Sequence, residues 1–110
     1  MIQYSSSNHI KQKGIIETMG KPEGTIENYL IKKATENNCL CYKFVSPGKR
    51  GVPDRIVIGK GKTIFVELKS ETGSLRKQQE YRIQQMIEHG ADVRVLNTKE
   101  KIDKFFEELK

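Results

Sequence analysis

The sequence predicts a single α/β (α+β) domain in which helices pack on a mixed β-sheet. Apolar residues recur at helical spacing in three segments, and four short runs rich in β-branched and aromatic residues are typical of strands. The predicted order is helix, three strands, helix, strand and helix. Consecutive hairpin strands followed by a crossover make a mixed sheet. A chain of 110 residues has room for one domain with one modest core.

The first part of the domain is expected to contain one helix and three strands. Thr25 is a candidate N-cap, and apolar residues then recur at helical spacing until Asn37 and Asn38 end the helix. A segment with two glycines, a proline and two positive charges predicts a loop between the first two strands, and Lys60-Gly61 predicts a tight turn between the next two. The strands are expected at residues 40–45, 55–58 and 63–69.

The second part is expected to contain a helix, a strand and a final helix. Ser74 is a candidate cap of the first of these helices, and Gly90 is its natural C-terminal stop. The alternating segment 92–96 predicts the strand. The apolar faces of the two helices consist of Leu75, Ile83, Met86 and Ile87, and of Ile102, Phe105, Phe106 and Leu109.

The pattern is least regular in residues 1–22, which we assign to an N-terminal arm, so the domain is expected to span residues 23–110. Within the arm, Ile10–Met19 predicts a short helix or an extended arm. The chain has no apolar run as long as a membrane span and no signal-peptide core, which favours an intracellular location. Cys39 and Cys41 lie in an apolar stretch without nearby zinc ligands, so we expect buried thiols.

The charge of the chain favours an anionic partner. Lys and Arg number 20 against 14 Asp and Glu, a net charge of +6 with neutral histidines. Nucleic acid is the commonest partner of such a domain, although many small basic proteins bind nothing in particular.

Three charged side chains are predicted to share one face of the second hairpin. If Lys60-Gly61 is a two-residue turn, Gly59 pairs with Lys62, and counting outward places Asp54 opposite Glu67. Residues opposed in this way have Cβ atoms about 4.5–5.5 Å apart, so two carboxylates would repel unless a cation lay between them. Lys69 projects from the same face as Glu67.

This arrangement suits chemistry on a phosphate. Carboxylate oxygens bind hard cations such as Mg²⁺ or Mn²⁺, which make water more acidic and stabilise charge on a scissile phosphate. A lysine beside the ion can orient the attacking water or offset developing negative charge. Taken singly, each residue is more simply a solvated charge at a strand end, but their combination favours a site. The sequence has no Ser-His-Asp set, Walker loop or dinucleotide fingerprint, and no organic cofactor is expected.

The segments Gly51-Val52-Pro53-Asp54-Arg55 and Val66-Glu67-Leu68-Lys69 closely resemble the virus-type replication-repair nuclease (VRR-NUC) domain of the PD-(D/E)XK superfamily. The flanking segments 43–48 and 75–79 also match, and the resemblance covers roughly residues 25–96. It implies an α-β-β-β-α-β core and phosphodiester cleavage with Mg²⁺ or Mn²⁺. Stand-alone phage and bacterial members resemble this chain in size and are associated with homodimers that cut branched DNA.

The resemblance also implies roles for individual residues. Asp54, Glu67 and the backbone carbonyl of Leu68 correspond to metal ligands, and Lys69 corresponds to the catalytic lysine. An acid on the first helix usually joins the site, and here that position is Glu27, which could otherwise be a first-turn glutamate favoured by the helix dipole.

The family further uses a glutamine on the helix that follows the lysine strand. Gln79 lies between Leu75 and Ile83 at four-residue steps, on the inward face, whereas Gln78 falls off that line. We therefore assign the role to Gln79, although a glutamine on an apolar face can also be a packed polar residue.

We expect basic residues near the acids to contact phosphates of DNA. The candidates are Lys43, Lys49, Arg50 and Arg55, and on the helix Arg76, Lys77 and, less strongly, Arg82.

The sequence thus predicts a magnesium- or manganese-dependent endonuclease that acts on DNA, by family analogy on branched DNA such as a Holliday junction. A phage-encoded protein would work in the host cytoplasm. We expect a homodimer, with Ile10–Met19 or the apolar face around Phe105 and Phe106 as candidate interfaces. The alternatives are a non-catalytic DNA-binding module on a nuclease scaffold and a restriction enzyme, which normally needs a longer chain for base readout.

Overall fold

The computed structural model describes residues 24–70 and 72–110, and their order of elements confirms the predicted α+β class. None of the helices in these two ranges is long and apolar enough to cross a membrane. The elements are α2 (Thr25–Glu36), β1 (Leu40–Lys43), β2 (Arg55–Gly59), β3 (Lys62–Leu68), α3 (Lys77–Glu88), β4 (Val93–Leu96) and α4 (Lys99–Leu109).

The four strands form one mixed sheet in the order β1-β2-β3-β4. The first three are antiparallel neighbours, and β4 runs parallel to β3, with α3 as the crossover between them. Gly59 pairs with Lys62 as the sequence predicts. Lys60 and Gly61 have φ values of 54° and 77°, and a two-residue turn with both central residues at positive φ matches the twist of the strands it joins.

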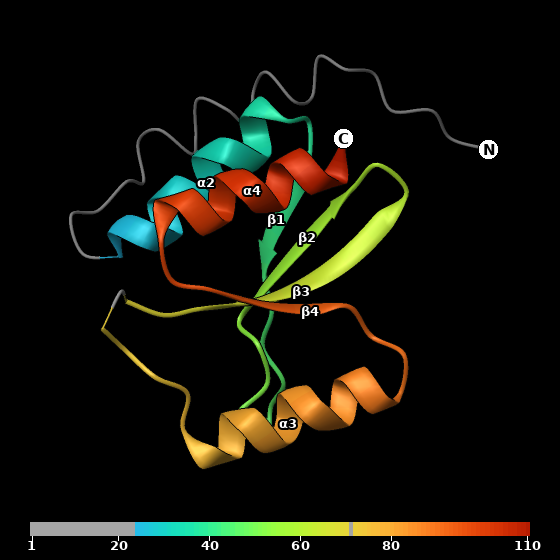
Figure 1. Ribbon diagram of the computed structural model, residues 1–110. Helices are drawn as coiled ribbons and strands as arrows, with labels where there is room; N and C mark the ends of the chain where they lie inside the picture. Colours follow the sequence, from blue (N-terminus) through green and yellow to red (C-terminus); the bar gives the residue numbers. More distant parts are fainter. Residues whose placement is uncertain (1–23, 71) are drawn as a thin grey trace.

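The two faces of the sheet are covered differently. Helices α2 and α4 lie together on one face, and α3 lies alone on the other (Figure 1). Side chains alternate between the faces of a strand, so Val57, Ile64 and Val66 point toward α2 and α4, whereas Phe65 and Glu67 point toward α3.

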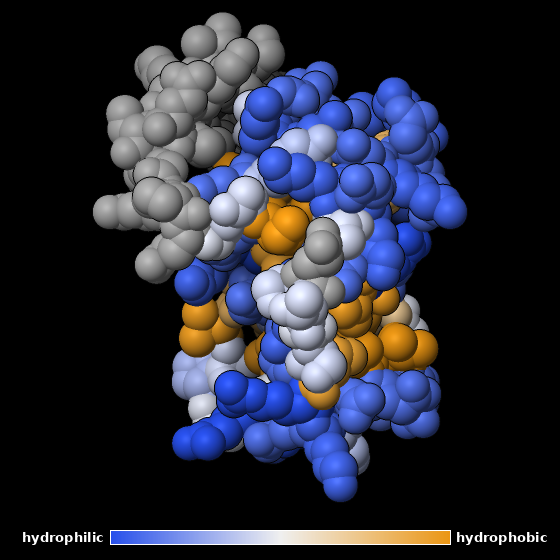
Figure 2. Space-filling view, turned by 60° about the vertical axis from the view of Figure 1, so that its left-hand side comes forward, coloured by the Kyte–Doolittle hydropathy of each residue, from blue (hydrophilic) through white to orange (hydrophobic). Residues whose placement is uncertain are grey.

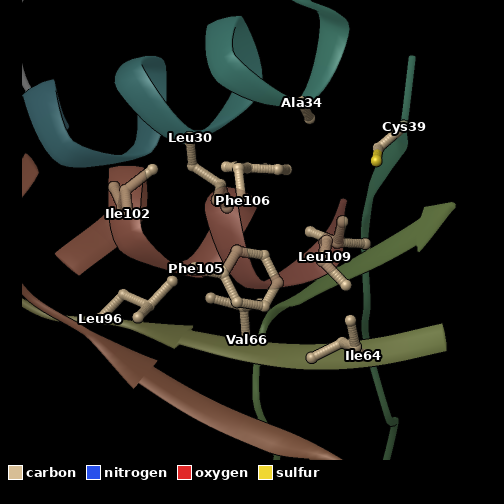
Figure 3. Packing of buried hydrophobic residues seen from close by; sticks show 11 residues of the cluster. Leu30, Ala34, Cys39, Ile64, Val66, Leu96, Ile102, Phe105, Phe106 and Leu109 are labelled. Atoms are coloured by element: carbon tan, nitrogen blue, oxygen red, sulfur yellow. The ribbon is translucent and has the colours of Figure 1, made fainter. Parts of the chain in front are cut away.

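The hydrophobic core fills the space between the sheet and the pair α2 and α4 (Figure 3). Leu30, Ile102 and Phe106 pack between the two helices, while Phe105 and Leu109 face the strands. The rings of Phe105 and Phe106 meet edge to face with their centroids 5.0 Å apart.

Phe105 and Phe106 are each only 2% exposed. The apolar face of the last helix is therefore part of the protein's own core, and its interpretation as a dimer interface is wrong. The other candidate interface, Ile10–Met19, lies outside the described residues.

Two helices begin at other residues than the sequence suggests. The N-cap of α2 is Gly24, at φ 75°, and Thr25 is already helical. The N-cap of α3 is Arg76 rather than Ser74, because the Gln79 side chain reaches back and accepts a hydrogen bond of 2.9 Å from the Arg76 backbone N–H. Leu75 consequently precedes the helix.

Both cysteines are free thiols, as expected. Cys39 is buried directly before β1, and a Cβ atom added at Gly59 would lie 2.5 Å from its sulfur, which explains a glycine at this strand position. Cys41 lies within β1, and burial raises its pKa to about 11. Neither is a ready thiolate nucleophile at neutral pH.

Candidate active site

Asp54 and Glu67 meet at one end of the second hairpin. Arg55 pairs with Val66, so continuing the register by one residue places Asp54 opposite Glu67. The backbone N–H of Phe44 donates to the carbonyl oxygen of Asp54 at 2.9 Å, which extends the pairing of β1 with this segment beyond the start of β2. Both carboxylates therefore belong to the face of the sheet that α3 covers.

Glu67 is the buried charged residue of this face, with only 4% of its surface exposed. Burial raises the pKa of its carboxyl group, and the negative charge of Asp54 raises it further, while Lys69 acts in the opposite direction. The Lys69 Nζ atom lies 3.6 Å from Glu67 Oε2. The sequence-based group of two acids and one lysine is thus brought together by the fold.

The Oδ1 atom of Asp54 is buried and has no hydrogen-bond partner within residues 24–70 and 72–110. A buried carboxylate oxygen without a partner is costly, so this arrangement favours a cation beside Asp54 and Glu67. Magnesium is commonly held by one or two carboxylates together with several waters. The donor set therefore fits a hard divalent ion.

Gln79 connects the start of α3 to the buried acid. Its Nε2 atom donates to Glu67 Oε2 at 3.0 Å, while its Oε1 atom accepts from the Arg76 N–H. Both ends of the amide are engaged, which fixes its orientation. Gln78 is exposed and lines the cleft in front of the acids. Helical spacing thus selected the glutamine that contacts Glu67.

An open cleft of about 230 Å³ lies in front of the two carboxylates. It is large enough for a phosphate group and its surroundings, and one wall comes from the loop before β2, the other from the start of α3. Its lining consists of Arg50, Gly51, Val52, Asp54, Glu67, Arg76, Gln78 and Gln79.

Two contacts hold the loop against α3. Gly51, at φ 87°, lies so close to the helix that an added Cβ atom would be 2.6 Å from the Gln78 carbonyl oxygen. The Arg82 Nε atom donates to the carbonyl oxygen of Arg50 at 3.0 Å. Arg82 therefore fixes the cleft wall, a role the sequence did not reveal because it depends on where a loop remote in sequence passes the helix.

Glu27 is placed differently from the other acids. Its Oε2 atom accepts from Arg55 Nε at 2.9 Å and from Arg55 Nη2 at 2.6 Å, on the side of the sheet that faces α2. Within the described ranges, no three His, Cys, Asp or Glu side chains converge as a metal-binding group. The structure thus brings Asp54 and Glu67 together without Glu27.

The predicted DNA contacts fall into three groups. Arg55 is engaged by Glu27, and only 12% of its side chain is exposed, which leaves little of it open to DNA. Arg50 and Arg76 line the cleft. Lys43, Lys49 and Lys77 are exposed at the end of β1, in the loop and at the start of α3.

These features define a mixed-sheet α+β domain with two acids, a lysine and a glutamine at one end of its central hairpin. Residues 22–100 match the VRR-NUC domain family, and the chain belongs to that family. A solved structure described as a VRR_NUC domain has a TM-score of 0.71 and 27% sequence identity, covering 80% of this chain and 97% of its own.

A phage relative also matches. It is named "Putative nuclease p44", from Acyrthosiphon pisum secondary endosymbiont phage 1, and is 51% identical over 49 residues. The match covers 44% of this chain and 53% of the relative, so the chain spans about half the length of the protein it matches.

Proposed function

We propose that this chain is a divalent-metal-dependent DNA endonuclease that hydrolyses phosphodiester bonds with Asp54, Glu67, Lys69 and Gln79. The observation that carries the proposal is the buried, unpartnered Oδ1 of Asp54 opposite the buried Glu67 carboxylate, within the residues described. Membership of a nuclease-domain family and similarity to a phage protein named as a nuclease support the reaction class.

In this proposal, Asp54, Glu67 and the Leu68 backbone carbonyl hold Mg²⁺ or Mn²⁺. The ion, when bound, lowers the pKa of water and offsets negative charge on the phosphate. Glu27 is held by Arg55 through its Oε2 atom, so this ligand set does not include it. A bound cation would also favour the charged form of Glu67, whose pKa is raised in its absence.

Lys69 and Gln79 act on groups around the acids. The ammonium of Lys69, beside Glu67, is placed to orient the attacking water or to stabilise negative charge on the phosphate. Gln79 holds the Glu67 carboxylate in one orientation through its Nε2 donor. These contacts hold the Glu67 carboxylate in place in the absence of DNA.

We propose that the exposed basic residues around the cleft position the DNA backbone. Arg50 and Arg76 line the cleft, and the exposed Lys43, Lys49 and Lys77 would add further phosphate contacts. Charge reversal at Lys49 and Arg50 should weaken binding and flatten its salt dependence.

We further propose branched DNA as the substrate and a homodimer as the working form. One small domain with one metal site cuts one strand at a time, whereas resolving a four-way junction needs two cuts on opposing strands. A two-fold dimer supplies both by symmetry.

The proposal is tested with labelled four-way junctions, flaps, splayed arms and linear duplexes. The protein is incubated with Mn²⁺ or with EDTA, and Asp54→Asn serves as the matched variant because it keeps the shape of the side chain. Cleavage should require Mn²⁺ and Asp54, and junctions should receive paired, symmetry-related nicks.

Binding without cleavage under any metal condition would instead indicate a non-catalytic DNA-binding module. A protein that is a stable monomer in light scattering and nicks only one arm, or that prefers flaps, would contradict the proposed junction substrate and homodimer. It would leave the proposed metal-dependent nuclease activity unaffected.

A further inference from the structure

An exposed aromatic side chain lies on α3, one helical turn from the cleft-lining Gln78 and outside the core cluster. Tyr81 on α3 is 60% exposed, and the guanidinium carbon of Arg82 lies 5.3 Å from the centre of its ring. The ring thus offers a face to solvent beside a positive charge.

Helix geometry relates this ring to the cleft. Gln78 lines the cleft, and Tyr81 and Arg82 follow it by three and four residues on α3. Residues at these spacings are neighbours on a helix surface, with Cβ atoms roughly 5–6 Å apart. The Arg82 Nε–H to Arg50 carbonyl bond and the close approach of Gly51 attach the same flank of the helix to the cleft wall. The segment of α3 that carries the ring is therefore held at the cleft wall.

The charge around the ring suits a nucleic acid strand. Lys77 precedes Tyr81 by four residues and is its neighbour on the helix surface, and Arg82 adjoins the ring itself. An aromatic ring among cations binds single-stranded nucleic acid through base stacking and phosphate attraction together. In a paired duplex the base faces are already stacked, so such a ring distinguishes DNA with unpaired nucleotides.

We propose that Tyr81 and Arg82 form a stacking platform for an unpaired nucleobase of the DNA strand that enters the cleft. This platform rests on the proposed DNA-cleaving function and deepens it, because it supplies a physical reason for preferring branched or partly single-stranded DNA. Stacking is tolerant of sequence, since each base has a π face. The platform therefore selects structure rather than sequence.

The test measures binding to two DNAs of equal length. One is a fully paired duplex, and the other carries a short unpaired segment containing 2-aminopurine, whose fluorescence falls when it stacks. Binding is followed in EDTA, so that cleavage does not contribute. The variants are Tyr81→Ala and Tyr81→Phe, with Ile87→Ala as the matched control, because Ile87 is an exposed apolar residue of the same helix further from the cleft.

Tyr81→Ala should weaken binding to the unpaired DNA by about tenfold, abolish the quenching and leave the affinity for the paired duplex nearly unchanged. Tyr81→Phe, which keeps the ring, and Ile87→Ala should behave as the parent. Equal loss on both DNAs, unchanged affinity in Tyr81→Ala, or loss of binding in Tyr81→Phe would overturn the platform.

The two proposals fail in different ways. A protein that binds the unpaired DNA through Tyr81 but never cuts would contradict the endonuclease and keep the platform. Cleavage that depends on Asp54, with no effect of Tyr81→Ala on binding, would support the endonuclease and contradict the platform. A parent protein that binds neither DNA would also contradict the platform.

Discussion

The two faces of the sheet differ in composition: one forms the hydrophobic core, and the other carries the proposed active site. On the face under α2 and α4, Val57, Ile64 and Val66 are at most 1% exposed and belong to the hydrophobic core cluster. On the face under α3, the same strands present Asp54 and Glu67 to a cleft. Because the first face supplies the core, the second can keep carboxylates that are costly to desolvate. Because successive side chains of a strand point to opposite faces, the same hairpin contributes both to the core and to the proposed active site.

The α3 face is also less completely covered. Figure 2 shows apolar surface in the band between the α3 layer at the bottom and the α2 and α4 layer above it. Among the exposed apolar side chains, Tyr42 and Val95 belong to the edge strands of the sheet and Ile87 to α3. Changes on this face should therefore affect function more than stability, and changes on the other face should do the opposite.

The largest expected effect is on catalysis. Lys69→Ala should lower single-turnover cleavage by about 10³-fold, because the proposed mechanism uses the Lys69 ammonium to orient water or offset charge on the phosphate. The melting temperature should change little, since the amine group contacts Glu67 at the cleft and not the core. Cleavage at the parental rate would contradict the site.

A core substitution should show the opposite pattern. Phe106→Ala should reduce the free energy of unfolding by about 3–5 kcal/mol, because a fully buried ring leaves a cavity. Phe65→Ala, on the α3 face, should cost less since Phe65 is only partly buried. Urea denaturation measures the free energy of unfolding of both variants. Equal losses would contradict the proposed difference between the two faces.

The two glutamines of α3 offer a matched pair. Gln79→Ala should reduce turnover by about 10–100-fold, because it frees the buried Glu67 carboxylate to change orientation. Gln78→Ala should be mild, since this exposed residue only lines the cleft. Equal effects in steady-state cleavage, or the reverse order, would refute the assignment of the faces of α3.

The smallest expected effect is the contribution of the Cys41 thiol to the pH dependence of stability. Burial raises its pKa from 9.0 to about 11, so the unfolded chain ionises first as pH rises. The contribution of this group to stability is complete below about pH 9 and should decline between pH 9 and 11. Urea titrations across this range should show a shallower decline in Cys41→Ser, and the native thiol should react slowly with a thiol reagent at pH 8.

Local patterns predicted the parts of the site that lie on regular elements. The tight turn at Lys60-Gly61 sets the register, and the register alone places Asp54 opposite Glu67. Helical spacing was enough to bring Gln79 to the acids. These inferences succeeded because strand and helix periodicities are fixed by backbone geometry.

The remaining features depend on how distant segments meet. The ion pair of Glu27 with Arg55 joins residues 28 positions apart, and the Arg82 contact with the Arg50 carbonyl joins residues 32 apart. The start of α3 at Lys77 depends on a side chain that caps the helix from within. Such contacts cannot be predicted from the spacing of residues along the chain. A charged residue near a sequence motif can form an internal ion pair as readily as it can bind a ligand.

Direct titration with Mn²⁺ in the absence of DNA tests the central claim, that Asp54 and Glu67 form a metal site apart from the core. At a Mn²⁺ concentration about 100-fold above Kd, the free energy of unfolding of the parent should rise by about 2.7 kcal/mol. Asp54→Asn should lose this increase, whereas Asp92→Asn, at an exposed surface carboxylate, should keep it. Equal stabilisation of Asp54→Asn and the parent would contradict the account.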